Sequence, residues 1–138
     1  MNETGYIKSV NRHINWQHYW KINDVYQGGV PDCFYEGTTH ELWIEYKYIS
    51  AKKFPKRETT LIDCTKEKDF LSRLQQLWIE RRHNFKKDAW VIVGSEHGGV
   101  IFRGLGWKIP LTSADFKLRA LPQQAVAAQI QAFIDGHE

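Results

Sequence analysis

Cysteine is scarce in this chain of 138 residues, and its two cysteines, Cys33 and Cys64, lack the C-x-x-C spacing of a zinc or redox motif. This usage suits a reducing compartment and argues against a zinc site. The six histidines show no metal-ligand spacing either, so a histidine-based metal centre is not predicted. We expect Cys33 to be a small buried hydrophobic residue.

Long hydrophobic runs are also absent. No stretch approaches the roughly 20 apolar residues of a transmembrane helix, and the first residues lack the basic region and apolar run of a signal peptide. We therefore expect a cytoplasmic protein that has no membrane partner. With 42% hydrophobic residues, the chain can bury one core, and we expect a single domain over residues 1–138.

Apolar periodicity predicts alternating helices and strands. We expect helices at about 3–13 and 67–85, strands at 18–24, 31–36, 42–49, 89–94 and 99–103, and a loop from 50 to about 65. This order predicts an α/β sandwich around a central mixed sheet of four or five strands. Thr112-Ser113-Ala114-Asp115 is a capping-box pattern that predicts another short helix.

Two of the predicted helices carry apolar stripes. In the long helix the stripe consists of Phe70, Leu71, Leu74, Leu77, Trp78 and Phe85, and Gln75 borders it. A C-terminal amphipathic helix is expected at about 123–135, with the stripe Val126, Ile130, Phe133 and Ile134. This second stripe either closes the core or contacts a second subunit.

The most informative motif pairs Gly29-Val30-Pro31-Asp32 with Trp43-Ile44-Glu45-Tyr46-Lys47. Strand side chains alternate between faces, so Glu45 and Lys47 lie on one side of the sheet. A hairpin that closes with the four-residue loop 37–40 puts Asp32 opposite Glu45. Because two opposed acids repel, a register shifted by a bulge is the alternative.

This set of residues has the chemistry of a phosphodiester-cleaving site. Two carboxylates a few ångströms apart call for a hard cation with oxygen ligands, Mg²⁺ or Mn²⁺. Such an ion activates water and polarises a phosphoryl oxygen. A lysine on the same face orients the water or offsets transition-state charge. We therefore predict Asp32 and Glu45 as metal ligands and Lys47 as the catalytic cation.

The order of these motifs resembles the PD-(D/E)XK nuclease superfamily, and more narrowly its VRR-NUC branch, over about residues 1–103. The resemblance implies a restriction-endonuclease-like fold and Mg²⁺-dependent hydrolysis of DNA. It also implies that Gln75 supports the lysine and the water, and that Glu3, on an N-terminal helix, is a further metal ligand. The alternative for Glu3 is an ordinary acid at a helix N-terminus.

Positive charge is concentrated beside the proposed site. The net charge is only +3, but residues 46–87 hold twelve Lys and Arg against five Asp and Glu. Lys52, Lys53, Lys56 and Arg57 follow the E-x-K strand, and we predict that they contact DNA phosphates. Arg81, Arg82, Lys86 and Lys87 end the long helix, where they also suit the helix dipole.

The resemblance and the short chain together imply an endodeoxyribonuclease selective for DNA structure, such as branched DNA or Holliday junctions. A homodimer that cuts two strands is expected, as is a phage-like origin with action in the host cytoplasm. Two alternatives stay open. One is a site-specific homing or restriction-type endonuclease, in which the 50–65 loop or the C-terminal region reads bases. The other is a non-catalytic DNA-binding accessory protein with the same fold.

Overall fold

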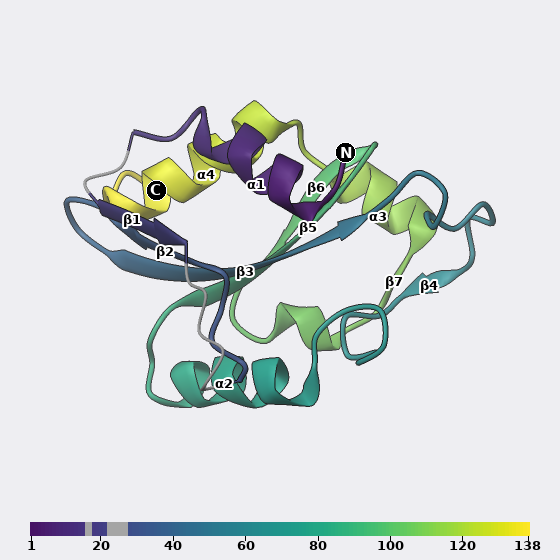
Figure 1. The fold of residues 1–138 in the computed structure, drawn as a ribbon, viewed down its shortest axis with the longest axis horizontal. Helices are drawn as coiled ribbons and strands as arrows, with labels where there is room; N and C mark the ends of the chain where they lie inside the picture. Colours follow the sequence, from purple (N-terminus) through teal and green to yellow (C-terminus); the bar gives the residue numbers. More distant parts are fainter. Residues whose placement is uncertain (16–17, 22–27) are drawn as a thin grey trace.

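The computed structural model describes residues 1–15, 18–21 and 28–138, which form one main sheet with helices on both faces (Figure 1). The elements are α1 (Glu3–Asn11), β1 (His18–Lys21), β2 (Cys33–Glu36), β3 (Glu41–Ile49), β4 (Leu61–Ile62), α2 (Arg73–Asn84), β5 (Ala89–Ser95), β6 (Gly98–Phe102), the 3-10 helix η1 (Gly106–Lys108), β7 (Leu111–Thr112), α3 (Ser113–Arg119) and α4 (Gln123–Ile134).

The main sheet is mixed and has five strands in the order β1-β2-β3-β5-β6. Its pairs are antiparallel except β3 and β5, which run parallel. Helices α1 and α4 cover one face, and α2 lies against the other (Figure 1). The predicted α/β sandwich with a central mixed sheet is confirmed.

Each face of the sheet packs its own core. On the α1 and α4 side, Ile44 and Tyr46 of β3 pack with residues of both helices. On the α2 side, Val91 and Val93 of β5 pack with Leu71 and with residues of α2 and α3. Strand β5 is buried along its whole length because it carries apolar residues toward both cores.

The predicted register of the β2–β3 hairpin is confirmed. Cys33 pairs with Ile44 and Glu36 with Glu41, so the loop spans residues 37–40 and no bulge interrupts the pairing. The loop contacts the end of α4, where the carbonyl of Ile134 accepts hydrogen bonds from the amides of Thr39 at 2.9 Å and His40 at 2.8 Å. The C-terminal helix is thereby joined to the hairpin.

The stripe of α4 closes the core, which decides between the two alternatives for this helix. Val126, Ile130 and Ile134 are buried, and Phe133 packs partly buried against the same core. The N-cap of α3 is Thr112, whose side chain accepts a hydrogen bond from the amide of Asp115, as the capping pattern predicted. No helix in the described part of the chain is long and apolar enough to cross a bilayer.

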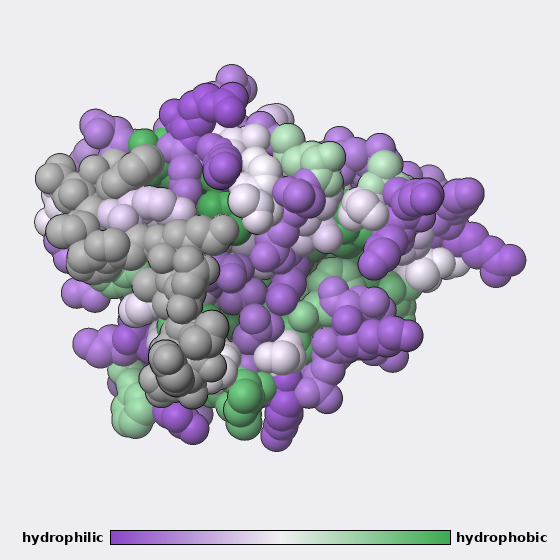
Figure 2. Space-filling view, viewed as in Figure 1, coloured by the Kyte–Doolittle hydropathy of each residue, from purple (hydrophilic) through white to green (hydrophobic). Residues whose placement is uncertain are grey.

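The prediction for the long helix was wrong in two respects. The helix begins at Arg73 rather than 67, because Ser72 caps it and the preceding residues form turns. Leu74 and Phe85 of the expected stripe are 56% and 70% exposed, whereas Gln76 and Ile79 are buried. Figure 2 shows hydrophobic surface over α2 accordingly.

The short pair β4 and β7 and the helix η1 were not predicted, since two- and three-residue elements are too short to show a period. Helix α1 ends two residues before the predicted boundary of 13. Residues 22–24 of the strand expected at 18–24 lie outside the described residues.

Candidate active site

Asp32 is held at the start of β2 by a tight approach of the chain to α2. Gly29 has a φ of +90°, and a Cβ at this position would meet the backbone carbonyl of Leu74. A residue with a side chain is therefore strained and obstructed there. Pro31 is buried, and Asp32 Oδ2 accepts a hydrogen bond of 3.1 Å from the backbone amide of Tyr46. This bond ties the first acid of the motif to the strand that carries the second.

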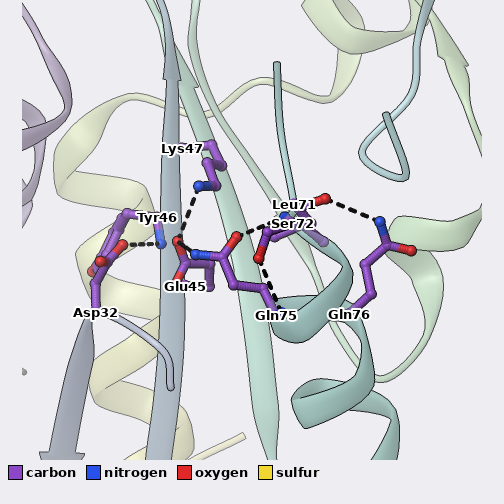
Figure 3. A network of polar contacts seen from close by, with 8 residues as sticks. All are labelled: Asp32, Glu45, Tyr46, Lys47, Leu71, Ser72, Gln75 and Gln76. Carbon is purple, nitrogen blue, oxygen red and sulfur yellow. Dashed lines mark hydrogen bonds and ion pairs between the residues drawn. The ribbon is translucent and has the colours of Figure 1, made fainter. Parts of the chain in front are cut away.

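Glu45 lies in the middle of β3 and is 1% exposed. Its Oε2 forms an ion pair with Lys47 Nζ at 3.3 Å and accepts a hydrogen bond from Gln75 Nε2 at 3.1 Å (Figure 3). Its Oε1 is buried and has no hydrogen-bond partner. Burial of a carboxylate oxygen without a hydrogen-bond partner costs free energy of folding, so the burial of Oε1 requires a physical reason.

The surroundings of Glu45 disfavour its charge. Burial is the main cause that raises its pKa well above the usual value, and the neighbouring carboxyl of Asp32 raises it further. Lys47 opposes this rise. Without an added cation, the site therefore makes ionisation of Glu45 less favourable than it is in water.

Gln75 is oriented by the first turn of α2. Its Oε1 accepts a hydrogen bond of 2.9 Å from the amide of Ser72, whose hydroxyl accepts one of 3.2 Å from the amide of Gln75. Because Oε1 is used in this capping box, the amide nitrogen is left to donate to Glu45. Ser72 therefore positions Gln75, a role that sequence reasoning missed although the S-x-x-Q spacing signals it.

The neighbouring Gln76 fixes the loop that precedes the helix. Its Nε2 donates to the carbonyl of Thr65 at 3.0 Å. It also donates to the carbonyl of Leu71 at 3.0 Å (Figure 3). The two consecutive glutamines thus serve different ends, since Gln75 faces the acidic pair and Gln76 holds the segment from residue 65 to the start of α2.

Glu3 is the first residue of α1 and is partly buried. Its negative charge is among the causes that raise the pKa of Glu45, so it acts on the electrostatics of the site. Within residues 1–15, 18–21 and 28–138, however, no three His, Cys, Asp or Glu side chains gather into a group that could hold a metal ion. The structure brings Asp32 and Glu45 together, and Glu3 acts on this pair through its charge.

Asp32 and Glu45 have the chemistry to hold a divalent cation. Carboxylate oxygens are the ligands that Mg²⁺ prefers, and this ion is usually bound through one or two carboxylates while it keeps several waters. A cation would give the buried Oε1 of Glu45 a partner and would offset the repulsion between the two acids. The residues present therefore fit Mg²⁺ or Mn²⁺.

The basic residues of the 50–57 segment differ in their position. Lys52, Lys53, Lys56 and Arg57 are all exposed. Of the four, Lys53 lines a cleft that opens at the end of β3. Lys68, which the sequence analysis did not single out, lines the same cleft. In the second basic cluster, Arg82 lies over the ring of Trp78, 5.5 Å from its centre.

The chain matches no protein-family model and no curated protein sequence. Among solved structures it is similar to Hjc of Archaeoglobus fulgidus, a Holliday junction resolvase from an archaeal hyperthermophile. The TM-score is 0.53 at 14% sequence identity, and the match covers 92% of this chain and 96% of Hjc. The likeness extends over nearly the whole of both chains, and the fold of this protein is the restriction-endonuclease-like α/β sandwich.

Proposed function

We infer that the protein is a divalent-metal-dependent endodeoxyribonuclease. The observation that carries this inference is the buried carboxylate of Glu45, which has one oxygen unpartnered, Asp32 beside it and Lys47 on its other oxygen. A purely structural role gives no physical reason to bury Glu45 beside a second, half-buried acid that repels it. A cation site that faces a phosphodiester substrate gives a physical reason for this arrangement.

Each residue of the site has a distinct role in this proposal. Asp32 and Glu45 hold the cation, which supplies a Lewis acid for a phosphoryl oxygen and a water of lowered pKa. Lys47 stabilises the negative charge that develops on the phosphoryl oxygens. Gln75 keeps the carboxylate of Glu45 in orientation through its hydrogen bond to Oε2. Glu3 is the candidate for a further ligand.

The fold supports a proposal for the substrate class. Hjc is a Holliday junction resolvase, and its fold is shared over nearly the whole of this chain. We therefore propose branched DNA, including four-way junctions, as the substrate. A homodimer is proposed because two strands have to be cut. The VRR-NUC branch is proposed from the sequence motifs alone, as is a phage-like origin.

A cleavage panel tests the function. Purified protein with Mg²⁺ or Mn²⁺ should cut forked and four-way-junction DNA in preference to linear duplex or single strands. Asp32→Asn and Lys47→Ala should each lose at least 100-fold in rate. Glu41→Gln, an exposed acid at the start of the same strand, is the matched control and should cut at the wild-type rate.

The panel also separates the alternatives. Cleavage of a single duplex sequence would indicate a site-specific endonuclease. Binding of all substrates without cleavage by any divalent ion would indicate an accessory protein. Wild-type rates in Asp32→Asn would contradict the assignment of the site itself.

A further inference from the structure

A cleft of about 520 Å³ adjoins the candidate active site. Its wall includes Tyr48 and Ile49 at the end of β3, so it begins within two residues of Lys47, a distance of about 6.6 Å along a strand. The opposite wall is the loop 68–70, which leads into α2 and therefore toward Gln75. The acidic pair and the cleft thus share β3 and the start of α2.

The cleft combines apolar surface with positive charge. Phe70 contributes an aromatic ring, and Leu61, which is 59% exposed, adds aliphatic surface at the wall. Lys53 and Lys68 line the same cleft and are exposed. In Figure 2, hydrophobic surface lies recessed among hydrophilic side chains on the right of the view, where Figure 1 places β4 and the loop before α2.

This combination matches the parts of a nucleotide. A nucleobase has apolar faces that stack on aromatic side chains, and its phosphates are anionic. Asp69 at the cleft wall is an acceptor for the amino or imino hydrogens on a base edge. The volume lies within the range of about 300–1,000 Å³ that is typical of small-ligand pockets.

We propose that this cleft receives the base of an unpaired nucleotide next to the scissile phosphate, with Lys53 and Lys68 at the flanking phosphates. The proposal rests on the proposed nuclease function and specifies its substrate as DNA with an unpaired nucleotide beside the cut. A paired base has to be unstacked and unpaired before it enters such a cleft, whereas an unpaired base avoids most of that cost. Stacking accepts every base, so the preference is for DNA structure rather than sequence.

A crosslinking experiment tests the location of the base without requiring cleavage. A forked duplex that carries 5-iodouracil at the first unpaired nucleotide is bound to the full-length protein in EDTA and irradiated. We expect crosslinks on Phe70, mapped by mass spectrometry. The same probe with 5-iodouracil inside the paired arm should give at most one tenth of that yield.

Affinity measurements on variants test the chemistry of the cleft. Leu61→Glu, at an exposed position, should weaken binding of the fork about tenfold, whereas Leu118→Glu, an exposed leucine on α3 outside the cleft, should not. Lys53→Gln and Lys68→Gln should each weaken binding, and their neighbours Lys52→Gln and Lys66→Gln should have a smaller effect. Phe70→Ala should abolish most of the crosslink, and Phe70→Trp should restore stacking.

The outcomes distinguish the cleft from the nuclease. Cleavage of forks with crosslinks confined to other peptides would overturn the cleft proposal and leave the nuclease intact. Crosslinks on Phe70 in a protein that cuts no DNA with any divalent ion would support the cleft and contradict the nuclease. Equal weakening by Leu61→Glu and Leu118→Glu would also overturn the cleft proposal.

Discussion

Glu45 has the least favourable surroundings for a charge among the residues of the site. Its carboxylate is buried, Asp32 lies beside it, and one of its oxygens has no partner. A carboxyl whose pKa is raised by folding holds its proton more tightly in the folded than in the unfolded state. The carboxyl of Glu45 therefore contributes its full stabilisation below the pKa of the unfolded state, which is about 4.3. This contribution is lost as the pH rises through the pKa of the folded state.

Glu45→Gln should remove the loss of folding stability that Glu45 causes as the pH rises. In EDTA the variant should gain stability over the wild type as the pH is raised from 4 to 8, because a neutral amide cannot ionise. Urea unfolding at both pH values measures the difference, and Glu41→Gln is the exposed control on the same strand. Addition of Mg²⁺ at pH 8 should stabilise the wild type but not the variant. An equal difference at both pH values would contradict the prediction.

Gln75→Glu separates the capping role of Gln75 from its contact with Glu45. A glutamate at this position can still accept the hydrogen bond from the amide of Ser72, so α2 should stay folded. It replaces the donor to Glu45 by a third negative group, and cleavage should fall about 10- to 100-fold. Gln124→Glu, in the first turn of α4, makes the same change away from the site and should leave the rate unchanged.

At the scale of elements, the start of α2 determines the orientation of Gln75. The N-cap Ser72 satisfies the amide of Gln75, and Gly29 lets the chain before β2 pack against the backbone of Leu74. The first turn of one helix therefore contacts both the segment that leads to Asp32 and the carboxylate of Glu45. Loss of this cap should affect catalysis as well as stability.

Ser72→Ala and Thr112→Ala form a matched pair for this prediction. Both residues are N-caps whose side chains accept a hydrogen bond from the amide three residues later. Each variant should lose about 1 kcal/mol of unfolding free energy. Only Ser72→Ala should also slow cleavage, because only its helix carries a residue of the site. Equal rates in the two variants, measured where both are fully folded, would show that the cap does not position Gln75.

At the scale of the molecule, two groups of basic residues are candidates for contact with DNA. Lys52, Lys53, Lys56 and Arg57 follow the end of β3, whereas Arg81, Arg82, Lys86 and Lys87 lie at or just beyond the C-terminal end of α2. Gln75 is in the first turn of that helix, so the second group lies at the opposite end from the site. DNA that enters the cleft beside Lys47 should therefore contact the first group.

Neutralising Lys52, Lys53, Lys56 and Arg57 together should weaken DNA binding for all sequences. The slope of log affinity against log salt should become shallower by about 0.9 for each lost contact to duplex phosphate. The triple variant of Arg81, Lys86 and Lys87 is the control and should keep the wild-type slope. The opposite pattern in salt titrations of a duplex and a four-way junction would indicate that DNA lies at the far end of α2.

Local sequence patterns determined the helices and strands in which apolar residues recur with a clear period and whose ends are marked by turn residues. The register of the β2–β3 hairpin was predictable because a four-residue loop at 37–40 fits the strand alternation, although a register shifted by a bulge was the alternative. The stripe of α4 and the cap of α3 were visible for the same local reason. The grouping of Asp32, Glu45 and Lys47 followed directly from that register.

Tertiary structure alone decided how deeply Glu45 is buried, which side of α2 faces the core and where the cleft lies. These features depend on contacts between residues far apart in the chain, such as Gln75 with Glu45 and the lining of one cleft by Tyr48 and Phe70. Periodicity placed Leu74 in the core, but α2 packs through Gln76 and Ile79 instead. Which side of a helix is buried depends on the elements that it packs against. Those elements are set by the whole fold rather than by the sequence of the helix itself.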